Sequence, residues 1–146
     1  MSEKYQKITV GGLLVVDGKI LIVRRSEKED TLKGFYELSG GKVDFGEHPK
    51  DSLKREFMEE TNLKVEIERP YRIFTYVTHE GNRHTVEIVY ITVLNDNIEN
   101  LKLSGEHDDY KWISISEVDD FQMSDQIKIN IKEGFALLKG KNVNSH

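Results

Sequence analysis

The sequence predicts an α+β fold in which strands and helices form packed layers. Runs of apolar, β-branched residues indicate strands in both halves of the chain, and two segments carry the periodicity of amphipathic helices. One helical segment lies among the strand runs and the other follows them, an order that favours a layered α+β arrangement. The 146 residues suit one ordinary domain, so we expect a single domain over residues 1–146 with flexible ends at 1–7 and 141–146.

The first two strands are expected at residues 8–16 and 19–25, because Asp17-Gly18 between them favours a tight hairpin turn. The pair Gly11-Gly12 interrupts the first run. A β-bulge is the preferred interpretation of this pair, and close approach of a ligand is the alternative. Further strands are predicted at 64–68, 71–78, 85–94 and 108–113, with Pro70 separating the first two.

The helix among the strands is expected over residues 49–61, because Pro49 suits a first helical turn, where its missing N–H is harmless. The last helix follows Ser124, a good N-cap, and should end at Gly140. One apolar stripe should pack this helix on the sheet; it consists of Ile127, Ile131, Phe135 and Leu138.

An acidic stripe distinguishes the first helix from ordinary surface. Glu56, Glu59 and Glu60 are spaced i, i+3, i+4, so their carboxylates share one face of the helix. Leu53 and Phe57 lie beside this face at i, i+4 and should point into the core. We therefore expect the three carboxylates at the edge of the core, half-shielded from water.

These like charges repel one another by about 0.2–0.5 kcal/mol per i, i+4 pair, and more when partly buried. Arg55 can reach Glu59 and Lys64 can reach Glu60, which leaves Glu56 without a cationic partner. A divalent cation with oxygen ligands, Mg²⁺ or Mn²⁺, would balance the group. The alternative is a solvated Glu/Lys helix face that binds nothing.

The segment around the stripe resembles the signature box of the Nudix hydrolases. The matching residues are Gly41, Glu47 after five intervening residues, and the run Arg55-Glu56-Phe57-Met58-Glu59-Glu60-Thr61-Asn62-Leu63 after seven more. Asn62 departs from the usual glycine, although asparagine also suits the left-handed conformation that closes a helix. Ser39 stands where the family often has proline, and this difference bears only on the stiffness of the glycine loop.

The resemblance implies the mixed-sheet α/β/α sandwich of this family over nearly the whole chain. It also implies Mg²⁺-dependent (or Mn²⁺-dependent) hydrolysis of a diphosphate bond in a nucleoside diphosphate linked to another group. By the same resemblance, the carboxylates of Glu56, Glu59 and Glu60 and the carbonyl of Gly40 hold one to three metal ions.

The catalytic residues implied by the resemblance are Glu56, Arg55 and Glu106. Glu56 and Glu106 are both eligible as the general base, since Glu106 lies in an acidic loop ahead of a strand that carries the single tryptophan. A solvated acidic loop is the alternative for Glu106. Arg55 should orient Glu59 or Glu47 by a charge-assisted hydrogen bond, and Glu47 also suits a role as a helix cap.

Candidate substrate contacts flank the box on its N-terminal side. Arg24 and Arg25 end the second predicted strand, so their side chains should point to opposite faces, one toward a phosphate and the other into solvent. Tyr36 and Glu37 resemble the aromatic and Glu that often precede the box. Packing at the rim plus a surface charge is an equal interpretation of these two residues.

The sequence does not select the substrate. ADP-ribose-selective subfamilies often carry a proline where this chain has His79, and dinucleoside polyphosphate hydrolases a tyrosine where it has Glu80 and Gly81. A nucleoside triphosphate pyrophosphohydrolase is the default interpretation. The alternatives are hydrolysis of ADP-ribose, a nucleotide sugar or another diphosphate, and a non-catalytic nucleotide-sensing domain.

Composition restricts the partners. The net charge of −5 argues against general nucleic-acid binding, and the absence of cysteine excludes disulfides and zinc–thiolate sites. No signal-peptide or membrane-spanning pattern is seen, so we expect a cytoplasmic protein without a membrane partner. The histidines show no ligand spacing, and none is assigned to a metal. A homodimer is possible through an exposed edge strand near the first hairpin.

Overall fold

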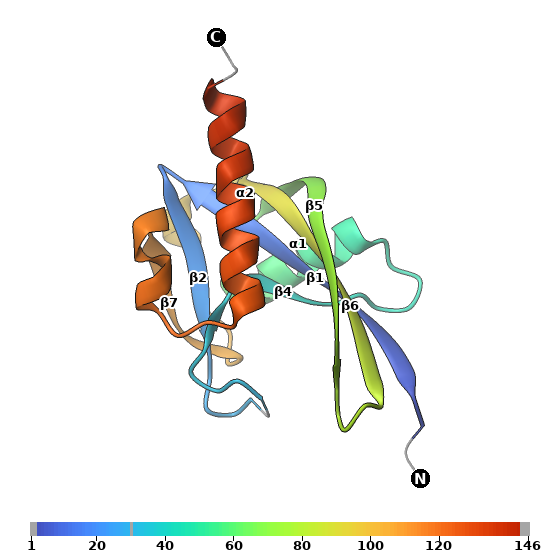
Figure 1. Ribbon diagram of the computed structural model, residues 1–146. Helices are drawn as coiled ribbons and strands as arrows, with labels where there is room; N and C mark the ends of the chain where they lie inside the picture. The colour runs from blue at the N-terminus through green and yellow to red at the C-terminus, as the bar shows by residue number, and fades with distance from the viewer. Residues whose placement is uncertain (1–2, 30, 144–146) are drawn as a thin grey trace.

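The computed structural model describes residues 3–29 and 31–143 and contains a seven-stranded mixed sheet (Figure 1). The strands are β1 (Tyr5–Val16), β2 (Lys19–Arg25), β3 (Tyr36–Glu37), β4 (Ser39–Lys42), β5 (Val65–Thr78), β6 (Arg83–Leu94) and β7 (His107–Ile113). The helices are α1 (Pro49–Thr61), α2 (Asp125–Val143) and the 3₁₀ segments η1 (Ile98–Asn100) and η2 (Ile115–Asp120). The strand order is β3-β2-β1-β6-β5, with β4 paired to β1 and β7 paired to β2.

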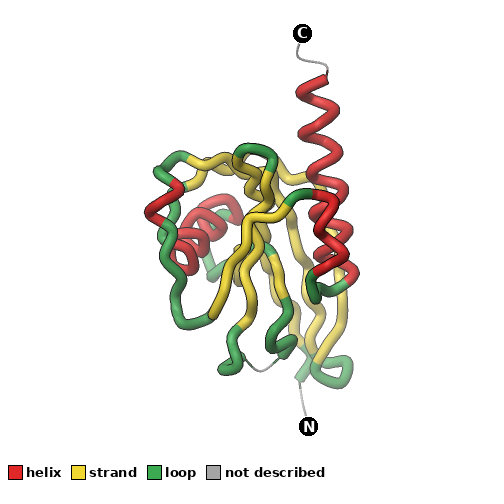
Figure 2. Tube along the Cα trace, turned by 90° about the vertical axis from the view of Figure 1, so that its left-hand side faces the viewer, coloured by secondary structure: helices red, strands yellow, loops and turns green. Residues whose placement is uncertain are grey.

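The central strand β1 organises the sheet, because it pairs parallel with β6 and antiparallel with β2 and β4. Figure 2 shows the strands between the long helix α2 and the shorter helix α1, which confirms the expected α/β/α layering. The first hairpin is not an edge of the sheet, since β2 is covered by β7 and β3, and β5 instead ends the strand order. The hairpin itself therefore offers no free edge to a partner, and the expected homodimer stays a prediction.

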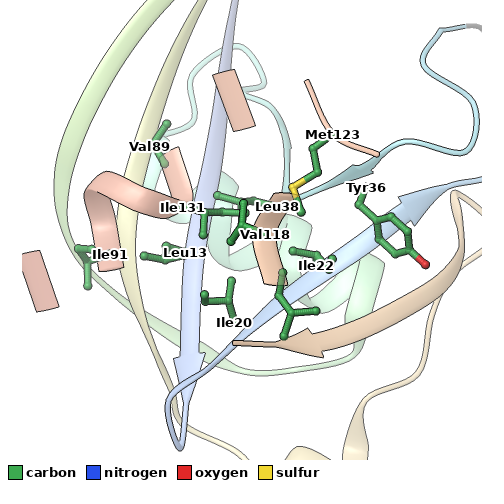
Figure 3. Packing of buried hydrophobic residues seen from close by; sticks show 11 residues of the cluster. Leu13, Ile20, Ile22, Tyr36, Leu38, Val89, Ile91, Val118, Met123 and Ile131 are labelled. Atoms are coloured by element: carbon green, nitrogen blue, oxygen red, sulfur yellow. The ribbon is translucent and has the colours of Figure 1, made fainter. Parts of the chain in front are cut away.

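Two apolar cores lie on opposite faces of the sheet because alternate residues of each strand point to opposite faces. On the α2 side, Leu13 packs with Ile131 and Val118, which Figure 3 shows converging. On the α1 side, Leu53 and Phe57 are fully buried against Leu14 and its neighbours, as the sequence predicted.

Helix α1 has the predicted bounds. His48 caps its first turn by accepting a hydrogen bond from the backbone N–H of Lys50. Asn62 closes it in the left-handed conformation, with φ of 61°, and its N–H donates to the carbonyl of Met58. The departure from glycine at this position thus leaves the helix end intact.

The prediction of a β-bulge at Gly11-Gly12 is wrong. The pairing of β1 with β6 runs without a register shift from Tyr5 to Leu14. A Cβ on Gly12 would lie 2.6 Å from the ring of Phe57 and 2.9 Å from the methyl carbon of Thr92. Glycine is required here because the aromatic ring of α1 packs directly on the backbone of β1.

Three predicted boundaries are also wrong. The two strands predicted at 64–68 and 71–78 are parts of one strand, β5. Its pairing with β6 shifts register on either side of Arg69 and Pro70, and β5 accommodates the proline because it lies at the edge of the sheet. Tyr5–Lys7, expected to be flexible, pair with β6. Helix α2 continues past Gly140 to Val143. The remaining expected flexible ends, 1–2 and 144–146, lie outside the described residues.

No helix in the described ranges is long and apolar enough to cross a membrane.

One carboxyl on the α2 face of the sheet lies outside the predicted site. Glu87 of β6 accepts a hydrogen bond from the Thr9 hydroxyl at 3.0 Å and is largely shielded from water. Burial raises the pKa of Glu87 to about 6, and the nearby charge of Glu37 adds to the shift. The folded protein therefore favours the neutral form of this carboxyl.

The two adjacent glycines of β1 provide a matched test of packing. Gly12→Ala should lower the free energy of unfolding by about 1–3 kcal/mol, because its methyl group overlaps the Phe57 ring. Gly11→Ala should change it by less than about 0.5 kcal/mol, since the nearest heavy atom is 3.5 Å away on Glu87. Urea denaturation of the two variants measures both values, and equal destabilisation would contradict the packing assigned to Gly12.

Glu87 should make stability depend on pH. Its pKa is about 6 in the folded state, above the unfolded value, so its ionisation opposes folding once the pH exceeds the unfolded value. The stability cost is absent near pH 4, grows as the pH rises toward 6 and is complete above it. Glu87→Gln should therefore stabilise the protein by about 2 kcal/mol at pH 8 and leave it unchanged near pH 4. Denaturation at the two pH values decides this, and a gain that is the same at both would contradict it.

Candidate functional site

Two glycines bring β4 against β1 and α1. A Cβ on Gly40 would overlap the backbone of Val10, and a Cβ on Gly41 would overlap the carboxylate of Glu56. Only glycine allows this close approach of backbone to backbone and of backbone to carboxylate. The glycine turn therefore sets the distance between the sheet and the acidic face of α1.

The guanidinium of Arg55 is the cationic centre of the acidic group. Its Nε and Nη2 donate to the two carboxylate oxygens of Glu47 at 2.9 and 3.0 Å. Its Nη1 donates to Glu56 at 3.0 Å and to Glu59 at 3.2 Å. Arg55 thus contacts both predicted partners, Glu47 and Glu59. The expectation that Glu56 lacks a cationic partner is wrong, because the planar guanidinium serves several carboxylates at once.

Glu47 is the most tightly held carboxylate of the group. Besides Arg55, it accepts hydrogen bonds from the hydroxyl of Ser52 and the backbone N–H of Asp44. The bonds to Arg55 and then to Ser52 lower the pKa of Glu47 to about 2. Glu47 is therefore ionised at neutral pH, and it fixes one edge of the guanidinium so that the other edge faces Glu56 and Glu59.

Glu60 is the least balanced carboxylate. It is 4% exposed and accepts hydrogen bonds from the Ser39 hydroxyl at 2.7 Å and the Gly40 N–H at 3.1 Å. Among the described residues no cationic side chain lies within ion-pair distance of it, so the expected contact with Lys64 is not formed. Burial raises the pKa of Glu60 well above the usual value, and the negative charges of Glu37 and Glu56 add to the shift.

Glu56 and Glu106 approach each other from different elements. The Glu56 side chain is 13% exposed, and burial raises its pKa against the opposing effect of Arg55, with smaller contributions from Glu59 and Glu106. Glu106 lies on the exposed loop before β7 and has no hydrogen bond or ion pair through its side chain within the described ranges. The fold thus brings the two candidates for the general base to one place.

The structure adds a histidine to this group that sequence reasoning missed. One ligand atom each from Glu60, Glu106 and His107 lie within 4.8 Å of one another. His107 is 4% exposed and contacts Glu37 through Nε2 at 2.9 Å. Its position next to Glu106 was visible in the sequence, but its partners come from α1 and β3, so no local spacing could have identified it.

Of the candidate substrate contacts, Arg24 and Tyr36 lie together on one face of the sheet. Arg24 forms an ion pair with Asp108 at 2.7 Å, and its guanidinium carbon is 5.9 Å from the centre of the Tyr36 ring. Tyr36 is buried in the α2-side core and its hydroxyl donates to Asp109 at 2.6 Å. Burial and the bond to Asp109 raise the pKa of Tyr36 to about 12. Both side chains already have internal partners.

Arg25 and Glu37 lie together on the opposite face, next to His107. Arg25 is paired with Glu37 and with Glu29, each at 3.3 Å, and also donates to the carbonyl of Thr31. The two arginines therefore point to opposite faces, as the alternation of the strand predicted. Glu37 connects Arg25 to His107 and so to the carboxylates of Glu60 and Glu106.

Comparison with known proteins agrees with these features. The NUDIX domain model matches residues 6–133. A protein of Escherichia coli named nucleoside triphosphatase NudI is 30% identical over 117 residues, which cover 74% of this chain and 82% of that protein. A protein of Methanocaldococcus jannaschii named ADP-ribose pyrophosphatase is 31% identical over 84 residues. That match covers 58% of this chain and only 48% of the archaeal protein, about half its length.

Solved structures share the whole fold. The crystal structure of a MutT protein from Methanosarcina mazei Go1 has a TM-score of 0.76 and 26% sequence identity, and covers 97% of this chain and 99% of its own. The match of the family model over most of the chain, the box carboxylates of Glu47, Glu56 and Glu59 held by Arg55 and the shared α/β/α sandwich lead to one conclusion. This chain belongs to the Nudix hydrolase family, whose members act on pyrophosphate bonds.

Proposed function

We propose that this protein is a divalent-cation-dependent pyrophosphohydrolase that cleaves a nucleoside triphosphate and releases pyrophosphate. The observation that supports it most strongly is the buried, unbalanced carboxylate of Glu60 beside Glu56 and Glu106. Burying several carboxylates costs folding energy unless a cation or protons compensate the charge. A group of carboxylates that stays buried at this energetic cost is expected where a cation is bound for catalysis.

The ligands of the cation are proposed to be the carboxylates of Glu56, Glu59 and Glu60 together with the carbonyl of Gly40. This oxygen-rich donor set fits Mg²⁺ or Mn²⁺. When bound, such an ion neutralises charge on the phosphate oxygens and lowers the pKa of a bound water. Arg55 keeps Glu56 and Glu59 on one side of α1, and Glu47 in turn holds Arg55.

Glu56 and Glu106 are the proposed candidates for the general base. The raised pKa of Glu56 brings it closer to neutrality, which suits a residue that takes a proton from water. The side chain of Glu106 has no hydrogen-bond or ion-pair partner in the described part of the chain, so it is free to turn toward a substrate. The general base alone cannot supply most of the rate enhancement of the hydrolysis, because a general base raises the rate by only about 10²–10⁴-fold.

The nucleoside triphosphate is proposed as substrate because NudI of Escherichia coli, named a nucleoside triphosphatase, is matched over 82% of its length. ADP-ribose is the second candidate, because the Methanocaldococcus jannaschii relative is named an ADP-ribose pyrophosphatase. The match to that relative stops at about half its length, which makes it the weaker support. A sensing domain without activity fits less well, because no box carboxylate is lost.

The function is tested by analysing products after incubation with Mg²⁺ and a panel of nucleoside triphosphates, ADP-ribose, nucleotide sugars and dinucleoside polyphosphates. We expect a nucleoside monophosphate and pyrophosphate from at least one triphosphate. Glu59→Gln should lower kcat at least about hundredfold, because the loss of its charge weakens the cation site. The exposed Glu99→Gln on η1 is the control and should retain full activity. Turnover of ADP-ribose alone would replace the proposed substrate, and unchanged kcat in Glu59→Gln would contradict the proposed ligand.

The role of Arg55 in holding the carboxylates is tested by Arg55→Lys. Lysine keeps the charge but cannot donate to both oxygens of Glu47 while also reaching Glu56 and Glu59. We expect kcat to fall at least about tenfold, with weaker Mg²⁺ binding by calorimetry. Lys54→Gln on the same helix removes only an exposed ion pair with Glu66 and should change neither value. Equal Mg²⁺ affinity in Arg55→Lys and the unmodified protein would contradict this role.

A further inference from the structure

The outer edge of β5 is open over the second half of the strand. Within the described ranges β6 is the only strand that pairs with β5, and residues 71–78 form no backbone hydrogen bond outside this pairing. Figure 1 shows that the hairpin of β5 and β6 extends past the first turn of α2. An edge of this kind offers free N–H and C=O groups to another strand.

The first half of β5 is protected against pairing with another strand, and the second half is not. The first half contains Pro70, the charged side chains of Glu66 and Arg69, and two register shifts with β6. Prolines, charges and bulges are the features by which proteins block an edge strand. Residues 73–78 are uncharged, rich in β-branched and aromatic side chains, and paired with β6 without a shift. Such a segment on an open edge associates with other strands unless a partner covers it.

This segment also exposes apolar side chains on both faces of the sheet. Ile73 and Val77, on the α1 face, are 65% and 58% exposed. Tyr76 points to the opposite face and is 39% exposed. Single exposed apolar residues are normal on a protein surface, but three within five residues of an open edge form a patch that a partner can cover.

The order of residues in the segment is symmetric about Thr75. Phe74 and Tyr76 on either side of it are aromatic, and Ile73 and Val77 beyond them are aliphatic and β-branched. In an antiparallel pair of two copies with a two-fold axis at Thr75, Ile73 lies opposite Val77 of the partner subunit. Phe74 then lies opposite Tyr76 of the partner subunit. Aromatic and β-branched pairs of this kind stabilise antiparallel strands, and a two-fold interface requires a self-complementary surface.

The limits of the segment fit the same axis. Pro70, five residues before the axis, has no N–H to donate to a further strand. Glu80, five residues after the axis, has a φ of 56° and belongs to the turn before β6. Arg72 is charged and would lie opposite Thr78 of the partner subunit. Like charges therefore do not meet across the axis, although each copy has a net charge of −5.

We propose that the protein forms a two-fold symmetric dimer in which residues 71–79 of two copies pair antiparallel, with Thr75 on the axis. The pairing joins the two sheets into one continuous sheet and satisfies the free backbone groups of both edges. The association stops at two copies, because both contribute the same edge. This inference goes beyond the proposed function and does not depend on which phosphate compound is cleaved.

The chain contains no cysteine, so single introduced thiols report the register of the pairing. Thr75→Cys places two thiols opposite each other across the axis, and mild oxidation should join them in a disulfide between the two chains. Ile73→Cys alone, or Val77→Cys alone, places the two thiols about 13 Å apart along the strands, too far for a disulfide. A mixture of these two variants should cross-link, because Ile73 lies opposite Val77 of the partner subunit.

Sedimentation equilibrium measures the assembly itself. We expect the mass of two chains for the unmodified protein. Thr75→Lys should weaken self-association at least about tenfold, because it places like charges opposite each other on the axis. The control is Val93→Lys, which replaces a 43% exposed residue of β6 outside the segment and should leave the dimer unchanged.

Three outcomes would overturn the proposal. One is a single-chain mass of the unmodified protein at all concentrations up to about 100 μM. Another is a dimer that folded Thr75→Lys leaves as stable as before. The third is cross-linking of Ile73→Cys alone in place of Thr75→Cys, which would show a different register. The cysteine variants keep the test decisive if Thr75→Lys does not fold.

Discussion

The crowding of carboxylates on one face of α1 is the constraint on which the rest of the structure depends. Arg55 compensates Glu47, Glu56 and Glu59 through one planar guanidinium, but it does not contact Glu60. Glu60 instead lies against the glycine turn of β4, where a hydroxyl and a backbone N–H are its donors. The remaining negative charge is concentrated where α1, β4 and the loop before β7 meet.

The local features of this arrangement could be predicted from the sequence. The spacing of Glu56, Glu59 and Glu60, the buried pair Leu53 and Phe57 and the closing role of Asn62 all follow from helix geometry. These features involve residues within one or two helical turns of each other. The periodicity of the chain fixes such relations before any tertiary contact forms.

Features that depend on contacts between distant segments could not be predicted. Two glycines in a strand suggested a bulge, but Gly12 is needed because Phe57 packs on its backbone, a contact that the local sequence does not reveal. His107 comes close to Glu37 and Glu60 only after β7, β3 and α1 assemble. The spacing of the histidines along the chain therefore did not mark it as a possible ligand. Pro70 looked like a strand end because its accommodation depends on β5 being at the edge of the sheet. Each error has the same cause, a partner far away in sequence.

The parallel pairing of β1 with β6 has a consequence for synthesis of the chain. Tyr5 to Leu14 pair with Arg83 to Thr92, so the central strand must wait for a partner that follows just over half of the chain length later. Contacts between such distant segments slow folding because a long loop must close first. On the ribosome, the apolar hairpin of β1 and β2 therefore emerges well before the strand that covers it. During this interval it is exposed to self-association, which makes early chaperone binding advantageous.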